Sequence, residues 1–346
     1  MTLKDLFTKK ESSIFKYINP FGCDKFSDLK GLDLQDLIIL INNYYLQLRD
    51  TIGIDDYITF GLELEFEHCK KDKIEKELEK NKLYDNGWKI KRDSTLINGA
   101  EINSPILMDT KQTWEELDEV CSIVNPLAKI DVNSGGHIHI GTHILGIEKN
   151  SWINFLKLWS VYENIIFRFS YGEYLTSRPE IMEYASVIKN YFWKKQEEFS
   201  KESIDMKDIV YRIKGDKYNA VNFRNVYYIN PNYFKKDNTI EFRCPNGTLD
   251  PVIWQNNVNF FVKLLLYSKS TSFNDDLVQK RHKLTENKYY GLEWYKEIYI
   301  DQALELCDMM FDNNLDKVYF LRQYLKSFEV SKDNKYIKAK ALTKNK

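Results

Sequence analysis

Residues 57–67 have the sequence YITFGLELEFE, which gives the strongest indication of the fold. Its second half alternates strictly, with leucine or phenylalanine between the glutamates Glu63, Glu65 and Glu67. A side-chain period of two is typical of an extended strand, because successive residues point to opposite faces of the sheet. The stretch therefore predicts a strand with one apolar side that faces the core and one acidic side.

Further short strands and several helices are predicted on either side of this stretch. Extended segments are expected at 88–92, 101–106, 136–141, 218–229 and 239–244, with an Asn98-Gly99 turn between the first two. Apolar residues at helical spacing or apolar runs predict helices at 34–48, 151–169 and 251–268, with Ser151 as the N-cap of the second. Helices are also expected at 111–129, at the charged segment 71–82, at 180–217, where the pattern is poor, and in the polar region beyond 269. Strands and helices do not alternate as regular βαβ units, and this order favours an α+β fold with a mainly antiparallel sheet.

The charge balance excludes a globally basic protein that coats nucleic acid. The 346 residues include 50 Lys+Arg and 51 Asp+Glu, a formal net charge of −1, whereas phosphate binding by counterion release needs a surplus of cations. With 43% hydrophobic residues the chain is able to build a core rather than stay disordered. Its longest apolar runs, 37–41 and 264–267, fall far short of the roughly 20 residues that a membrane span needs. We expect neither a nucleic-acid partner nor a membrane segment.

The cysteines and the N-terminus indicate a reducing compartment. The five cysteines are far apart and form no CxxC pair, which excludes a disulfide framework and a zinc knuckle. The N-terminal sequence MTLKDLFTKKESS has charges where a signal peptide needs an apolar core. We therefore expect a cytoplasmic protein.

Histidine gives the sharpest chemical signal, in NSGGHIHIGTH at residues 133–143. His137 and His139 lie two apart on a predicted strand, so both rings leave the same face. Gly135 and Gly136 just before them allow a backbone or a ligand to come close. A pair of hydrogen-bonded structural histidines is the alternative, but Gly-Gly-His-x-His in a chain with only 14 glycines favours a functional interpretation.

The alternating glutamates permit two interpretations. Acidic side chains on one strand face repel one another, which is tolerable if the face is solvated or if a divalent cation binds there. Oxygen ligands suit Mg²⁺ or Mn²⁺, and an added histidine shifts the preference towards Mn²⁺ or Zn²⁺. In TIEFR, residues 239–243, Glu241 and Arg243 also share one face. They form either a simple salt bridge or a metal ligand beside a phosphate clamp.

Several familiar nucleotide and hydrolase motifs do not occur in the sequence. It contains no GxxxxGK loop, no GxGxxG and no Gly-x-Ser-x-Gly elbow. A nucleotide-using enzyme of this sequence would have to hold phosphates with metals and arginines. Arg224 is a further candidate cation for this purpose.

Five motifs, taken together and in order, resemble the putative amidoligase family, a branch of the glutamine synthetase-like carboxylate–amine ligases that also include the glutamate–cysteine ligases. The motifs are GLELEFE (61–67), WKIKRDSTL…AEINSPIL (88–107), NSGGHIHIG (133–141), KYNAVNF (217–223) and TIEFRCPNGTLDP (239–251). The resemblance implies an antiparallel glutamine synthetase-like sheet with flanking helices, whose concave face binds ATP and two or three Mg²⁺ or Mn²⁺ ions. The resemblance covers about residues 57–265 and implies a catalytic domain, taken as 56–268. The helical patterns outside it predict a helical N-terminal extension (1–55) and a helical C-terminal region with a basic tail (269–346).

The resemblance also implies roles for particular residues. The implied metal ligands are Glu63, Glu65, Glu101, His137 and Glu241. The implied nucleotide-binding residues are His139, Asn222 and Arg243, and the implied catalytic residues are Arg243, Arg224 and Asp93. The sequence departs from the pattern at two points. Only Glu101 is a clear second-strand carboxylate, so that either Asp93 replaces the missing one or a third metal is absent, and Ser94 stands where the family usually has glycine.

The implied activity is an ATP-dependent ligation of a carboxylate to an amine through an acyl phosphate, on amino-acid or peptide substrates that residues 170–217 help to select. Two alternatives stay open: a metal-dependent hydrolase that uses the His-x-His pair, which would favour His-rich zinc ligation, and a non-catalytic nucleotide- or metal-binding module on the same fold. Dependence on ATP separates them. The sequence indicates no oligomeric state.

Overall fold

The structure is a computed structural model that describes residues 45–176, 178, 180–213, 217–226, 238–285, 298–326 and 342–343. The chain divides into two compact units. The larger unit comprises Arg49–Glu163 and Arg178–Lys288, and the smaller comprises Met1–Leu48, Asn164–Ser177 and Tyr289–Lys346. All of the predicted site residues belong to the larger unit.

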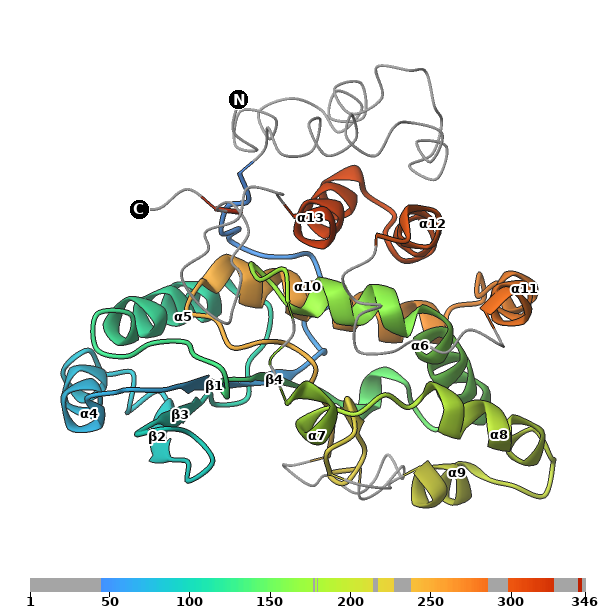
Figure 1. Cartoon of the computed structure of the whole chain (residues 1–346), viewed down its shortest axis with the longest axis horizontal. Coiled ribbons are helices and arrows are strands. Elements are labelled where there is room, and N and C mark those ends of the chain that lie inside the picture. Colours follow the sequence, from blue (N-terminus) through green and yellow to red (C-terminus); the bar gives the residue numbers. More distant parts are fainter. Residues whose placement is uncertain are drawn as a thin grey trace. The chain divides into compact units, whose positions relative to one another are not determined.

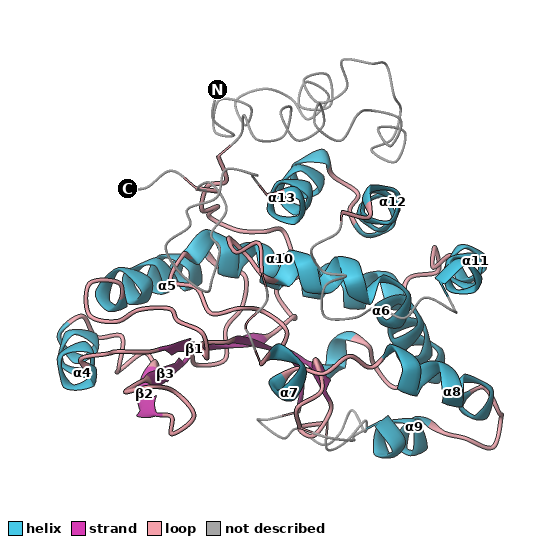
Figure 2. Cartoon of the chain, in the orientation of Figure 1, coloured by secondary structure: helices cyan, strands magenta, loops and turns pink. Residues whose placement is uncertain are grey.

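An antiparallel sheet forms the centre of the larger unit (Figures 1 and 2). Its strands within the described residues are β1 (Phe60–Phe66), β2 (Lys89–Arg92), β3 (Ala100–Asn103), β4 (Gly136–Gly141), β5 (Val221–Asn222) and β6 (Thr239–Phe242). Their order across the sheet is β2-β3-β1-β4-β6-β5, and every neighbouring pair is antiparallel. The prediction of a mixed fold with a mainly antiparallel sheet is confirmed.

Helices cover the apolar face of this sheet. They are α5 (Lys111–Val124), α10 (Pro251–Lys269) and the first part of α6 (Lys149–Ser170), and Figure 1 shows α5 and α10 on the same side of the strands. Trp114 of α5 stacks on Phe60 at 5.4 Å between ring centroids, and Phe261 of α10 stacks on Phe242 at 4.2 Å. Because the core takes every second strand residue, the intervening residues are left on the opposite face.

Two of these helices have an N-cap residue whose side chain accepts a backbone hydrogen bond. Thr110 accepts a hydrogen bond from the Thr113 backbone N–H at the start of α5. At the start of α10, Asp250 accepts from the Val252 N–H, and Pro251 follows at the first helical position, where its missing N–H costs nothing. Further helices of the larger unit are α4 (Lys71–Lys80), α7 (Ile181–Tyr184), α8 (Lys189–Phe199), α9 (Met206–Ile213) and α11 (Asp275–Thr285).

The smaller unit has its own apolar contacts, between the end of α6 and the helices α12 (Ile300–Met310) and α13 (Asn314–Leu325). Phe169 stacks on Phe320 at 5.2 Å. Arg168 Nε donates to the Tyr324 carbonyl at 3.0 Å, which satisfies an acceptor at the C-terminal end of α13. No helix in the described ranges has the length and apolarity needed to cross a membrane.

Four sequence predictions about local structure need correction. Residues 45–48 are not helical, since Leu46 instead forms a parallel bridge with Thr343; the rest of the predicted 34–48 helix lies outside the described residues. Helix α6 begins at Lys149, so Ser151 lies in its first turn and is not the cap. The single helix predicted for 180–217 is broken into α7, α8 and α9, and the predicted 218–229 strand shortens to β5 within the described residues.

Two further predictions concern cysteines and the chain ends. The cysteines in the described ranges, Cys69, Cys121, Cys244 and Cys307, are all free thiols, as their spacing predicts. Nearly all of the predicted N-terminal extension and most of the basic tail lie outside the described residues. The three-region division therefore stays a prediction.

Candidate metal and oxyanion site

The strand register gathers the predicted site residues on the sheet face opposite the core. The cross-strand pairs are Glu63–Asn103, Glu63–His137, Glu65–Glu101, His139–Glu241 and Asn222–Glu241. All five predicted metal ligands and two of the predicted nucleotide-binding residues belong to these pairs. An in-register antiparallel sheet thus assembles these carboxylates and imidazoles from four strands.

One group of possible metal ligands consists of Glu63, His139 and Glu241, each of which offers an atom within 4.8 Å of the others. His139 Nδ1 lies 3.2 Å from Thr239 Oγ1. Its Nε2 is buried, lies 3.1 Å from Glu63 Oε1, and forms no well-aligned hydrogen bond within the described residues. A buried imidazole nitrogen that faces carboxylates without such a bond suits a divalent cation.

A second group consists of Glu65, Asp93 and Glu101, again within 4.8 Å of one another. The Gly135 backbone N–H donates to Glu65 Oε2 at 2.6 Å, and Lys91 Nζ lies 2.6 Å from Glu101 Oε1. Three carboxylates without an imidazole are the donor set that hard cations such as Mg²⁺ and Mn²⁺ prefer. Asp93 thus lies beside Glu101. A residue that replaced the missing second-strand carboxylate would have to lie there.

His137 lies between the two groups. Its Nδ1 is 2.9 Å from Glu63 Oε2 and 3.7 Å from Glu241 Oε1, while its Nε2 is 3.5 Å from Glu65 Oε1. Both ring nitrogens therefore face carboxylates. The role of His137 as a metal ligand stays a prediction, and the geometry adds His139 as a further candidate ligand.

The electrostatics of this face show how strongly it attracts positive charge. Burial alone would raise the pKa of Glu63, but its close contacts with His137 and His139 hold it well below its usual range. Burial would lower the pKa of His139, yet its contacts with Glu63 and Glu241 raise it. Burial raises the pKa of Glu101 despite the neighbouring Lys91. A proton on His139 thus supplies part of the positive charge that a cation would supply.

Asp93 is held in place at the edge of this face. Its Oδ1 accepts hydrogen bonds from the Thr95 backbone N–H at 2.8 Å and from Thr95 Oγ1 at 2.7 Å. Burial would raise the pKa of Asp93, but these two hydrogen bonds lower it. The carboxylate is therefore kept ionised and oriented next to Glu101.

Arg243 and Asn222 both contact Glu241. Arg243 Nη1 forms an ion pair with Glu241 Oε1, and its Nε donates to the Tyr184 carbonyl at 3.1 Å. Asn222 Nδ2 donates to Glu241 Oε2 at 2.6 Å. Arg224 differs from both, because its side chain is exposed and its backbone N–H donates to Asn222 Oδ1 at 2.9 Å. The structure therefore brings Arg243 and Asn222 to the cluster and leaves the Arg224 side chain towards solvent.

Glu67 has a structural role that the alternating pattern does not distinguish from that of its neighbours. It is fully buried. It accepts hydrogen bonds from the Ile97 N–H at 2.9 Å, the Asn133 N–H at 3.0 Å and Asn133 Nδ2 at 3.0 Å. Glu67 thus ties two loops to the end of β1.

Arg178 is a site residue that the sequence analysis missed. It is 4% exposed, and its Nη2 donates to the Arg243 carbonyl at 2.9 Å. It lies in a segment between α6 and α7 whose pattern is poor, so no sequence signal pointed to it. Only the folded chain brings this guanidinium next to the acidic face.

The Gly135-Gly136 pair is required by close packing, as its position before the histidines suggests. A β-carbon on Gly135 would lie 2.3 Å from Arg178 Nη1, and one on Gly136 would lie 2.8 Å from a ring carbon of Trp254. Real β-carbons do not approach other atoms this closely, so a side chain at either position would push the arginine or the tryptophan away.

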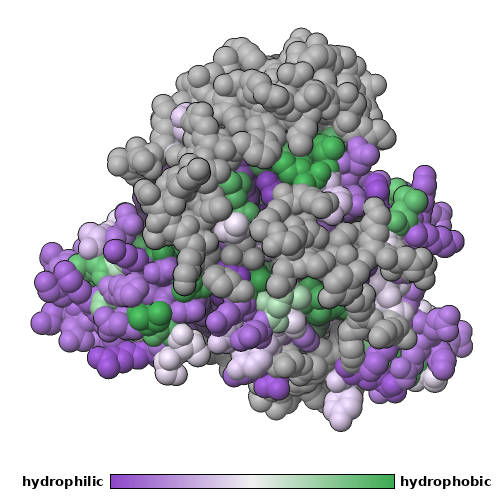
Figure 3. Space-filling view, viewed as in Figure 1, coloured by the Kyte–Doolittle hydropathy of each residue, from purple (hydrophilic) through white to green (hydrophobic). Residues whose placement is uncertain are grey.

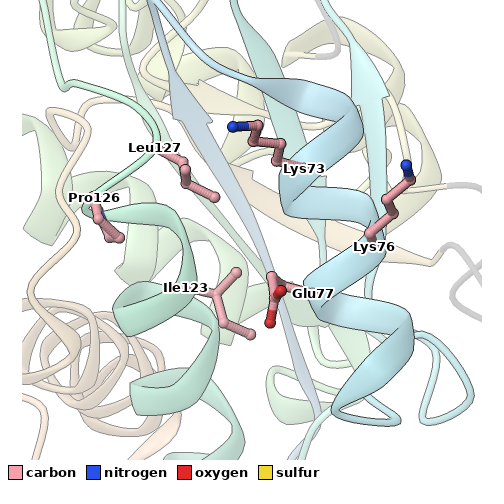
Figure 4. Close-up of a pocket in the computed structure, with 6 residues that line it drawn as sticks. All are labelled: Lys73, Lys76, Glu77, Ile123, Pro126 and Leu127. Atoms are coloured by element: carbon pink, nitrogen blue, oxygen red, sulfur yellow. The ribbon is translucent and has the colours of Figure 1, made fainter.

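A pocket of about 390 Å³ lies elsewhere in the larger unit, between α4 and the end of α5 (Figure 4). Its lining residues are Lys73, Lys76, Glu77, Ile123, Pro126 and Leu127. The surface over α4 is mainly hydrophilic with small hydrophobic spots (Figure 3). With one carboxylate and no imidazole, this lining does not provide a metal site.

Comparison with known proteins gives one family. A family model described as "putative amidoligase enzyme" matches residues 68–265, which is more than half of the 346-residue chain. The match begins directly after β1 and includes β2 to β6, with Glu101, both strand histidines and Glu241. No curated protein matches the chain.

Proposed function

This chain belongs to the putative amidoligase family, and from that premise we propose that it is an ATP-dependent ligase that joins a carboxylate to an amine. The proposed substrates are amino acids or peptides. The observation that carries the proposal is the sheet face on which two carboxylate-rich groups, two imidazoles and Arg243 lie together. Phosphoryl transfer needs this combination of cation sites and a guanidinium.

Divalent cations, Mg²⁺ or Mn²⁺, fit both groups of ligands on this face. Glu63, His139 and Glu241 would hold one cation, and Glu65, Asp93 and Glu101 would hold another. His137 borders both groups and is a candidate ligand for either. When bound, such cations neutralise phosphoryl oxygens and so favour attack on phosphorus by a weak nucleophile.

The proposed reaction has two steps. First, a carboxylate oxygen of the substrate forms a bond to the γ-phosphorus of ATP, and the bond from that phosphorus to the β,γ-bridging oxygen breaks and releases ADP. Second, the amine nitrogen attacks the carbonyl carbon of the acyl phosphate, the C–O bond to phosphate breaks, and the amine loses a proton. The amide and inorganic phosphate are the products.

The remaining polar residues of the face have distinct proposed tasks. Arg243 stabilises the charge on the transferred phosphoryl group while its ion pair with Glu241 fixes its position. Asn222 orients Glu241 through its side-chain hydrogen bond. A hydrolase with zinc bound mainly by histidine is a weaker fit, because carboxylates outnumber imidazoles in both groups.

The test is ADP formation from ATP with Mg²⁺ or Mn²⁺ in the presence of pools of amino acids and short peptides. We expect the pools to stimulate ADP formation, and we expect Glu63→Ala and Arg243→Ala each to reduce it at least 100-fold. Glu77→Ala on the surface of α4 serves as the control and should match the wild type. Absence of any nucleotide binding by the folded, metal-loaded chain would overturn the proposal.

A further inference from the structure

Arg178 is a buried cation on the acidic face to which the proposed reaction gives no role. It is 4% exposed, and its Nη2 donates a hydrogen bond to the Arg243 carbonyl oxygen. Its Nε is buried and has no hydrogen-bond partner within the described residues. Buried N–H groups rarely lack an acceptor in folded proteins, so an unpartnered one indicates a ligand that completes the site.

The position of the guanidinium follows from Gly135. A β-carbon on that glycine would lie 2.3 Å from Arg178 Nη1 and 3.0 Å from Glu65 Oε2. The arginine and the carboxylate therefore approach the glycine from the same side. Arg178 therefore lies on the Gly135 side of Glu65, which is one member of the group formed with Asp93 and Glu101.

No carboxylate within the described ranges lies within ion-pair distance of the Arg178 guanidinium. The nearby acids have other partners: Glu65 faces the His137 ring, Glu101 faces Lys91, and Glu241 pairs with Arg243. A buried charge without a counterion is costly. An anionic ligand would remove that cost.

We propose that Arg178 binds an oxyanion of a reactant, either the carboxylate of the acceptor substrate or a phosphoryl group of the nucleotide. This inference rests on the proposed function but concerns a residue outside the set that the sequence predicts. The planar fork of a guanidinium matches both oxyanions with paired N–H groups. Gly135 is the residue that leaves room for the fork.

Calorimetric titration of the full chain in Mn²⁺ tests the proposal directly. The probes are ADP, inorganic phosphate and glutamate, and the variants are Arg178→Gln and Arg178→Lys. We expect Arg178→Gln to weaken the affinity for at least one probe tenfold or more. Arg178→Lys should weaken that affinity less, because lysine keeps the positive charge but lacks the planar pair of N–H donors. A loss confined to glutamate assigns the carboxylate, and a loss for ADP or phosphate assigns the phosphoryl group.

Lys157→Gln is the matched control, since Lys157 pairs with Asp275 at a partly exposed position outside the acidic face. It should bind all probes as the wild type does. If Arg178→Gln does not fold, Arg178→Lys alone carries the comparison.

Two results would overturn the inference. One is unchanged affinity for all three probes in the Arg178 variants, even with a lowered melting temperature, because that pattern belongs to a purely structural arginine. The other is a wild-type chain that binds none of the probes. Pool-stimulated ADP formation is measured separately, so a ligase in which Arg178 has no role in binding remains distinguishable from a chain that is no ligase.

Discussion

At the scale of single residues, Glu63 and Glu67 show how one sequence pattern serves two purposes. Both are glutamates in the same alternating stretch of acidic and apolar residues. Glu63 faces two imidazoles, with oxygens 2.9 Å from His137 Nδ1 and 3.1 Å from His139 Nε2. Glu67 accepts its hydrogen bonds from loop amides instead. Glu63 is therefore available to a cation, whereas Glu67 stabilises the fold by binding loop amides.

Exchanging each glutamate for glutamine should separate the two purposes. In Glu67→Gln an amide NH₂ group would face N–H donors, and we expect a loss of about 2 kcal/mol in the free energy of unfolding. Mn²⁺ affinity, measured by calorimetry below the melting temperature, should stay within twofold of the wild type. In Glu63→Gln the Mn²⁺ affinity should fall at least tenfold with little loss of stability. The opposite pattern would show that the two roles are assigned the wrong way round.

Glu163 predicts a pH dependence of stability that is independent of the acidic face. It is buried, and burial raises its pKa to about 7, although Trp159 Nε1 and the Ile188 and Lys189 backbone N–H groups donate to it. Between the unfolded value of 4.5 and about 7, the native state keeps a proton that the unfolded state has lost. The contribution to stability therefore falls as the pH rises through this window, by about 3 kcal/mol in total.

Urea denaturation of the wild type and Glu163→Gln at pH 5 and pH 8 measures this effect. The glutamine does not titrate, so the variant should gain stability relative to the wild type as the pH rises. A difference that stays constant between the two pH values would contradict the prediction.

At the scale of elements, sequence periodicity predicts the strands well where one face is buried. The alternation at 57–67 and the sequence GHIHIG yield β1 and β4 at nearly the expected positions. β1 and β4 then pair as antiparallel neighbours, and the register of this pair places Glu63 opposite His137. Arg178 was not predictable, because it comes from a segment without periodicity and reaches the face only through tertiary packing. The division of 180–217 into α7, α8 and α9 was not predictable for the same reason, since the ends of these helices depend on contacts distant in sequence.

The start of β4 gives a prediction about packing. Gly136→Ala would place a β-carbon 2.8 Å from a Trp254 ring carbon and 3.0 Å from the Asn246 carbonyl oxygen. We expect a loss of about 1–3 kcal/mol, as for other overpacked sites, measured by the shift of the urea midpoint. Gly61→Ala on β1 is the matched control, because its β-carbon would meet its nearest neighbours at 3.7 Å and 3.8 Å. Equal losses in both variants would show that close packing at Gly136 is not the cause.

At the scale of the whole molecule, fold and chemistry depend on the same sheet. Its apolar face binds α5 and α10 through stacked aromatic rings, and its acidic face carries both groups of ligands. The family match covers most of these strands, while β1 lies just before it. For Glu63 and Glu65 the proposal therefore relies on the strand register and on the motif resemblance rather than on the family model.

Cation binding should stabilise the native chain, because the acidic face exists only when the sheet is formed. A cation at 100 times its dissociation constant adds about 2.7 kcal/mol of stability, which corresponds to a rise in melting temperature of about 5–11 °C for a domain of this size. We expect Mn²⁺ to raise the melting temperature by at least this amount and a chelator to reverse the rise. The combined variant Glu63→Gln/Glu101→Gln should show no rise, and a rise equal to that of the wild type would mean that the cation binds elsewhere.

The transfer of an oxygen isotope from substrate to phosphate decides whether the reaction passes through an acyl phosphate. An amino-acid pool with ¹⁸O-labelled carboxylates is incubated with the chain, ATP and Mg²⁺ in unlabelled water, and the inorganic phosphate is analysed by mass spectrometry. An acyl-phosphate ligase predicts one ¹⁸O atom in each phosphate formed in coupled turnover, because the carboxylate oxygen that attacks phosphorus leaves with it. Phosphate that carries no label, and that instead acquires ¹⁸O when only the water is labelled, would contradict the account and identify a hydrolase.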